Sequence, residues 1–535
     1  MSDTIRTYSG RKAASGVKRR SVWSAARAAL TAASLLFIGF GCWVIRDAVP
    51  LQRMIPAGEK YNIIAIDVLN NRGKIANSPL WRALPESIGV SRVPDLLTHT
   101  LGLPDWVFNN LIGEECHLSG NDVRSFGDAV FATKMRPIGV VIERFHWLAP
   151  GIERDAAGGL ELRRLANADV YYAVRGRVLI VSRSRDSLIR AVTLREQDSL
   201  SAAPPATDPA TESGAEDLRG TVALAPGDPL GDVFSTIRFA ARIDTPDTLV
   251  KCRAALSQAA RQRFGPMLEH AAPRALLAPP DGLIEVSGNF GEPIRDFLTN
   301  LGDAMKWPYL SDAAWERWET GPGEGADASQ VTPRLAQMLT QVAGPAGPSF
   351  WLTVHGVDVN EIIPTPEIVG VFEAKELDVA KSLREAAPPL PANAQAWESY
   401  VRYNAEEASL YLPLPAGGPS MTPTAMAWGD DLLISTSRRL AAQLAALPPV
   451  PVLLPHEGNL FVLVRPSKCV QALADASLLL ADVDGLRGYT RESLEEDIAR
   501  WTAQAGIVQE IWALASHQDA DVTLDIGIRC APPAN

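Results

Sequence analysis

The chain has 535 residues, of which 47% are hydrophobic, and it contains 13 Trp and 14 Phe. That composition supplies enough apolar material for packed domains and excludes an intrinsically disordered protein. The chain carries 51 Lys and Arg against 62 Asp and Glu, a net charge of −11. Such a surface repels phosphate backbones, so we expect no nucleic-acid partner.

The N-terminal residues combine a basic tail, residues 1–27, with an apolar run. Residues 28–45 carry no charged side chain, and a helix over them would be about 27 Å long, close to the thickness of a bilayer's hydrocarbon core. Basic flanks stay on the cytoplasmic side. The sequence therefore predicts a single-pass transmembrane signal anchor at 28–48. It would place the protein in the bacterial inner (cytoplasmic) membrane, with the N-terminus cytoplasmic and the ectodomain periplasmic or extracellular.

Two alternatives to an uncleaved anchor remain open. A cleaved signal peptide normally has a short basic region and a small-residue exit site, whereas the tail here is long and no Ala-x-Ala site follows the apolar run. A lipid-modified Cys42 is the other alternative, although Gly39 and Phe40 depart from the usual attachment pattern.

Four cysteines follow the predicted anchor, at positions 116, 252, 469 and 530. An oxidising compartment would permit two disulfides among them. Cys469 and Cys530 fall in the same C-terminal segment, so they are the preferred pair. Four buried free thiols are the alternative.

One order of residues occurs twice along the ectodomain. Residues 175–185 and 428–438 both contain Gly at a turn, an aliphatic strand and then Ser-x-Ser-Arg opening a helix. Other predicted strands match in the same order, and the pairs are 63–68 with 283–286, 138–142 with 369–372, 220–224 with 458–462, and 236–242 with 522–528.

These matches predict an α+β fold class: an N-terminal transmembrane helix followed by a duplicated α+β ectodomain with mainly antiparallel sheets. The two predicted halves are residues 56–275 and 276–532. Residues 198–217 are rich in Pro, Ser, Thr and Ala and contain no aromatic side chain, so we expect a disordered loop within the first half.

On the repeated strand and helix at 175–192 and 428–447, the chain resembles a broad, uncharacterised bacterial family of signal-anchored extracytoplasmic proteins of unknown function. The resemblance implies an extracytoplasmic location and an internal repeat. It implies no activity, cofactor or site residue.

Catalytic signatures are absent from the predicted ectodomain. It contains no Gly-x-Ser-x-Gly, HExxH, GxxxxGK[ST] or GxGxxG. Residues 114–117, Glu-Glu-Cys-His, are rich in ligand types, but neighbouring residues point in different directions and no second ligand pair follows. We therefore assign no catalytic, cofactor-binding or metal-binding residue.

Trp315 and Trp318 are one helical turn apart and would share a helix face. If exposed they would form a binding face, and if buried they would be part of the core. The sequence favours a membrane-anchored binding or scaffolding protein of the envelope, with an envelope protein as partner. The alternatives are a carrier or sensor with a pocket for a small apolar ligand between the two halves, and an envelope hydrolase whose site is assembled from distant residues.

Overall fold

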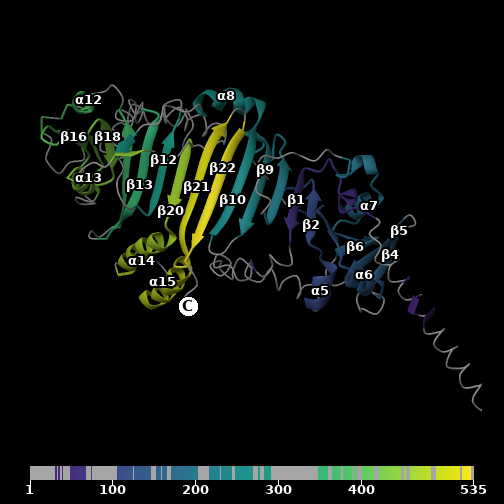
Figure 1. Ribbon diagram of the computed structural model, residues 1–535. Coiled ribbons are helices and arrows are strands. Elements are labelled where there is room, and N and C mark those ends of the chain that lie inside the picture. Colours follow the sequence, from purple (N-terminus) through teal and green to yellow (C-terminus); the bar gives the residue numbers. More distant parts are fainter. Residues whose placement is uncertain are drawn as a thin grey trace, which may run out of the picture. The chain divides into compact units, whose positions relative to one another are not determined.

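The computed structural model describes residues 49–67, 105–145, 152–202, 216–290, 347–414, 421–453, 458–482 and 490–531, with short gaps inside these ranges and a few isolated residues outside them (Figure 1). The chain forms two compact units. The first comprises Met1–Gly58, Leu101–His117 and Gly127–Pro204, and the second comprises Glu59–Thr100, Leu118–Phe126 and Pro205–Asn535.

The first unit contains an antiparallel sheet with helices on both faces. Its strands are hydrogen-bonded in the order β4, β5, β6, β7, β3. The unit boundary divides a further strand, β2 (Glu115–Gly120). The other elements are η1 (Leu51–Met54), α5 (Asp105–Leu111), β3 (Val130–Lys134), α6 (Pro137–Arg144), β4 (Ile152–Ala157), β5 (Leu160–Leu165), β6 (Val170–Arg175), β7 (Val178–Ser182), α7 (Arg185–Thr193) and η5 (Glu196–Asp198).

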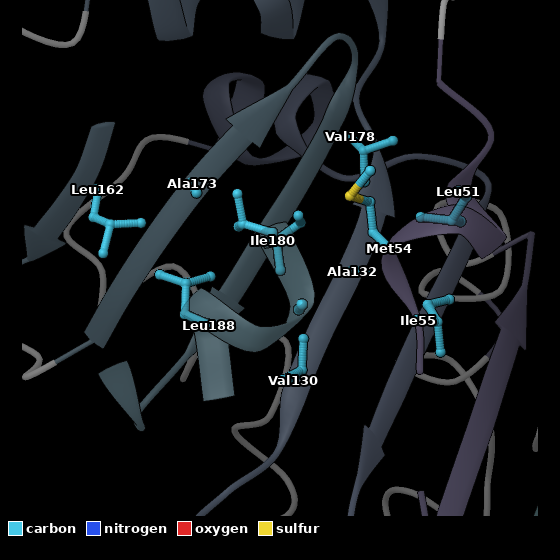
Figure 2. Close-up of a cluster of buried hydrophobic side chains, with 12 residues drawn as sticks. Leu51, Met54, Ile55, Val130, Ala132, Leu162, Ala173, Val178, Ile180 and Leu188 are labelled. Atoms are coloured by element: carbon cyan, nitrogen blue, oxygen red, sulfur yellow. The ribbon is translucent and has the colours of Figure 1, made fainter. Parts of the chain in front are cut away.

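Successive side chains of a strand point to opposite faces of the sheet, so the first unit has a hydrophobic core on each side of its sheet. On one side, Ile180 of β7 packs with Leu188 of α7 and Met54 of η1 (Figure 2). On the other side, Leu179 packs with Val140 of α6. The sheet is therefore the middle layer of three.

The second unit is built on one long antiparallel sheet. Its strands are paired in the order β1, β8, β9, β10, β22, β21, β20, β12, β13, β14, β18, β17, β16, β15. The strands are β1 (Tyr61–Ile66), β8 (Leu218–Ala223), β9 (Phe234–Ile243), β10 (Asp247–Leu256), β12 (Ile284–Asn289), β13 (Ser349–Asp358), β14 (Thr365–Glu373), β15 (Arg402–Asn404), β16 (Ser409–Tyr411), β17 (Thr424–Trp428), β18 (Asp431–Ser435), β20 (Leu460–Val464), β21 (Val508–Gln518) and β22 (Asp521–Cys530).

Helices lie against this sheet at several places. Helices α14 and α15 contact each other, and both contact β21. A separate two-stranded sheet joins β11 to β19. These elements are α8 (Gln258–Leu268), β11 (Ala275–Leu277), α12 (Val379–Ala386), α13 (Arg438–Ala445), β19 (Pro451–Leu453), α14 (Pro466–Asp482) and α15 (Arg491–Ala505).

One run of elements occurs in both units. The first module, residues 130–193, reads β3, α6, β4, β5, β6, β7, α7, and the second module, residues 365–445, reads β14, α12, β15, β16, β17, β18, α13. The pairing of the outer strand is the same in both: Val130 to Lys134 pair with Ser182 to Val178, and Val369 to Glu373 pair with Ser435 to Asp431. The two modules therefore share strand order and register.

The turn and the helix start are also the same in both modules. Gly176 and Gly429 each have φ of 60°, a left-handed conformation that glycine adopts without steric cost. Two residues after the end of each strand, Ser184 and Ser437 cap the following helix, accepting hydrogen bonds from the backbone N–H groups of Ser187 and Leu440. These two devices explain why the Gly, aliphatic, Ser-x-Ser order occurs twice.

The predicted fold class needs correction. The described chain is mostly antiparallel β, with helices as the minor component, rather than an α+β fold behind a transmembrane helix. No helix among the described residues is long and apolar enough to cross a membrane. This corrects the prediction of a single-pass signal anchor at 28–48, most of which lies outside those residues.

One local prediction is wrong. Residues 138–142 form part of α6 and are not a strand, and the strand that corresponds to β14 is β3. The ends of the predicted disordered loop 198–217 are ordered, since Ser199 is fully buried and the Asp217 backbone N–H donates to the Ala241 carbonyl. Residues 203–215 lie outside the described chain.

Candidate functional site

A cavity of about 150 Å³ lies in the second unit between α8 and the sheet. We call it the α8 cavity. Helix α8 begins after Ser257, whose hydroxyl accepts from the Ala260 N–H at 3.1 Å and donates to the Asp232 carbonyl at 2.8 Å. Its inner side buries Ala260 and Phe264 against Val233 and Leu256. Figure 1 shows α8 at the end of the strands β22 and β10.

Most of the side chains that line the α8 cavity are apolar. They come from α8, from the ends of β9 and β10, and from the β12, β20, β21 and β22 region, which are distant in the sequence. The lining residues are Val233, Phe234, Leu256, Phe264, Leu268, Phe290, Asn459, Leu460, Ala515, Ser516, His517 and Val522. A pocket of this composition suits an apolar guest.

Asn459 holds three elements of the wall together. It is 3% exposed, and its side-chain amide donates to the carbonyls of Leu268 at 2.9 Å and Asn289 at 3.3 Å. Its side-chain oxygen accepts from the His517 N–H at 2.8 Å. The end of α8, the end of β12 and the end of β21 are thus joined at one buried amide, whose polar groups are satisfied within the protein.

Two further polar side chains line the cavity. The Ser516 hydroxyl lies 2.5 Å from the Thr523 hydroxyl, so it is already hydrogen-bonded. The His517 Nε2 atom is buried and has no hydrogen-bond partner among the described residues. Because consecutive strand residues point to opposite faces, Ser516 and His517 do not form a nucleophile and base pair. The surface that faces the cavity is therefore apolar, and the buried Nε2 of His517 is not part of it.

The ligand-rich residues 114–117 form a structural cluster. His117 is 2% exposed and its Nε2 lies 2.7 Å from a Glu115 carboxylate oxygen. The Cys116 thiol donates to the Thr133 hydroxyl at 3.3 Å, and burial raises the pKa of Cys116 to about 11. A thiol with that pKa is neutral at physiological pH and a poor nucleophile. Within the described ranges, no group of three His, Cys, Asp or Glu side chains could hold a metal ion.

The predicted disulfide is absent from the structure. Cys469 and Cys530 are both free thiols, as are Cys116 and Cys252. Cys469 lies in the first turn of α14 with its thiol 3.7 Å from the Leu283 carbonyl, whereas Cys530 is buried at the end of β22. The predicted binding face of Trp315 and Trp318 lies outside the described residues.

The sequence offered little indication of the α8 cavity. Phe264, Phe290 and His517 are far apart along the chain, and no sequence motif connects them. Asn459 follows Gly458 in a segment that matched residues 220–224, and a buried asparagine at the start of an apolar strand was the one available signal. That signal indicates a polar anchor but does not reveal the neighbouring cavity.

No known protein family matches the chain, and no curated protein matches it. Solved structures with partial similarity include those of the protein TP0453. Its crystal form III is 10% identical, with a TM-score of 0.25, and the match covers 42% of this chain and 89% of that one. Its crystal form I is 8% identical, with a TM-score of 0.24, covering 40% of this chain and 81% of that one.

Proposed function

We propose that the chain binds a small apolar molecule in the α8 cavity and acts as a carrier or sensor of that molecule. The observation that carries the proposal is the cavity itself, about 150 Å³ of space beside buried Phe264, Leu256 and Phe290. An engineered cavity of about 150 Å³ with a comparable Leu, Ile and Phe lining stays dry and binds benzene.

The polar groups of the wall refine the expected ligand. The side chains of Asn459 and Ser516 already have hydrogen-bond partners in the protein, so they do not require a hydrogen bond from a ligand. The Nε2 of His517 is buried and does not face the cavity, whose exposed lining is apolar. An apolar ring or short chain therefore matches the cavity better than a ligand that carries a hydroxyl group.

Benzene and phenol are suitable probes, because both are small enough for a cavity of this size. Binding is measured on the full chain by saturation-transfer NMR and by the rise in melting temperature, since a ligand that binds only the folded state stabilises it. We expect benzene to bind more tightly than phenol, because the lining offers no polar group to the phenol hydroxyl.

A space-filling variant tests whether the α8 cavity is the binding site. Val233→Phe adds a ring to a residue that lines the cavity, and we expect it to weaken benzene binding by on the order of tenfold or more. Val141→Phe adds the same volume at an exposed position in the first unit and serves as the control.

Phe264→Leu enlarges the cavity and should shift the preference toward larger rings such as naphthalene. This second variant keeps the test informative if Val233→Phe does not fold. Benzene binding that survives in Val233→Phe, or its absence in the unmodified protein, would refute the proposal.

A further inference from the structure

Two contacting helices of the first unit expose four large apolar side chains. On α6, Ile138 is 59% exposed, Val141 is 43% exposed, and Phe145, directly after the helix, is 53% exposed. Trp106 of the adjacent α5 is 60% exposed. Positions 138, 141 and 145 are three and four residues apart, so they lie on one side of the helix. We call Ile138, Val141 and Phe145 the α6 face.

The opposite side of α6 fixes the orientation of the helix. Val140 and Glu143 are buried, and the Glu143 carboxylate accepts a hydrogen bond from Arg163 of β5. A Cβ added to Gly139 would lie 2.0 Å from the Asn110 carbonyl oxygen of α5, so the two helices touch through their backbones. Rotation that buried the α6 face would break all of these contacts.

The architecture of the module does not require an apolar outer face. Helix α12 follows the outer strand of the second module just as α6 follows that of the first, and it buries Val379 and Leu383. Its exposed residues are charged, among them Lys381 and Glu385, which form an ion pair at 3.9 Å. The α6 face is therefore a special feature of the first module.

The exposed charges at the two ends of α6 are basic. Arg136 caps the start of α6 and Arg144 ends it, and both are exposed. Glu143, the one acid in the helix sequence PIGVVIER, is buried and bonded to Arg163. This local surplus of positive charge contrasts with the 62 acidic and 51 basic residues of the whole chain.

We propose that the α6 face docks on an anionic lipid surface. Apolar and aromatic side chains beside arginines are the combination that inserts a helix into the headgroup region of a bilayer, with the guanidinium groups near the lipid phosphates. Trp106 suits the same boundary, because indole rings favour membrane interfaces. The proposal does not depend on ligand binding in the α8 cavity.

Vesicle flotation of the full chain tests the proposal. The vesicles contain equal parts phosphatidylcholine and phosphatidylglycerol, and pure phosphatidylcholine serves for comparison. The triple variant Ile138→Ser, Val141→Ser, Phe145→Ser should partition onto the mixed vesicles on the order of tenfold less than the unmodified chain. The double variant Arg136→Gln, Arg144→Gln should lose most of the preference for the anionic vesicles.

A matched control removes exposed apolar side chains elsewhere. Leu473 of α14 is 59% exposed and Trp501 of α15 is 43% exposed, and their replacement by Ser should leave flotation unchanged. All variants carry the apolar run 28–45, so its own affinity for lipid is the same throughout. Circular dichroism checks that each variant is folded.

Two results would overturn the proposal. One is equal flotation of the triple variant and the unmodified chain. The other is a triple variant that floats normally but converts an oligomer to a monomer in sedimentation, which would make the α6 face a contact between protein copies.

Discussion

The first and second modules have the same strand order, the same register between outer and inner strands and the same capped helix, but they differ in the helix that follows the outer strand. Helix α12 presents charged residues to solvent, whereas α6 presents Ile138 and Val141. What the modules share can be assigned to folding. What they do not share needs another explanation, and we assign the α6 face to function.

The largest expected effect concerns the shared core. Ile180 and Leu433 occupy the same register position in the two modules and are both fully buried. Replacing either with Ala should lower the free energy of unfolding of its own module by about 2–5 kcal/mol, through lost burial and a residual cavity. Hydrogen exchange of β7 and β18 in urea measures each module separately. A loss below about 1 kcal/mol in one variant would show that the two cores are not equivalent.

The shared turn should respond more weakly. Gly176→Ala and Gly429→Ala each place a side chain at φ of 60°, which costs about 1–2 kcal/mol. Gly58→Ala is the control, because an added Cβ there meets nothing within 4 Å. Thermal unfolding of the three variants gives the comparison. Unequal losses of stability in the two glycine variants would indicate that the two hairpins adjust differently to the added side chain.

The smallest expected effect concerns an arginine that both modules place at the first position of the capped helix. Arg185 donates to Asp155 at 2.6 Å, and this hydrogen bond holds the pKa of Asp155 below its ordinary value. Arg438 donates to Glu407 at 2.7 Å. Partial burial opposes ionisation of Glu407, but the hydrogen bond and charge of Arg438 outweigh it, so the pKa of Glu407 is also lowered.

The sign of the pH dependence follows from these lowered values. A carboxylate whose pKa falls on folding contributes stability above its unfolded pKa, and that contribution is lost as the pH falls through the folded pKa. Arg185→Gln and Arg438→Gln should therefore raise the pKa of Asp155 and Glu407 toward ordinary values, as followed by carboxyl NMR. A pKa that does not move in one variant would mean that the arginine is not the cause there.

Part of this architecture was readable in the sequence because it depends on local chemistry. The glycine of the left-handed turn and the serine that caps the helix are separated by the same number of residues in both modules. That spacing in the sequence identified the strands β7 and β18 between them. Residues 138–142 were predicted as a strand because every position except Gly139 is a branched aliphatic. Helix α6 buries Val140 but exposes the equally apolar Ile138 and Val141, so apolar residues do not mark its buried side alone.

The α8 cavity and the α6 face could not be predicted in the same way. Both depend on contacts between elements that are far apart in the chain, as when Asn459 joins the ends of α8, β12 and β21. Exposure of Ile138 is likewise set by the packing of Gly139 on α5. Neither the presence of the cavity nor the exposure of the α6 residues can be inferred from the spacing of residues in the sequence.

Hydrogen–deuterium exchange of the full chain with and without vesicles of phosphatidylcholine and phosphatidylglycerol tests the difference between the modules most directly. Peptides that cover α6 (Pro137–Arg144) and α12 (Val379–Ala386) are compared in the same sample. We expect vesicles to slow exchange in α6 and to leave exchange in α12 unchanged. Equal exchange in α6 with and without vesicles, or equal slowing in both helices, would contradict it.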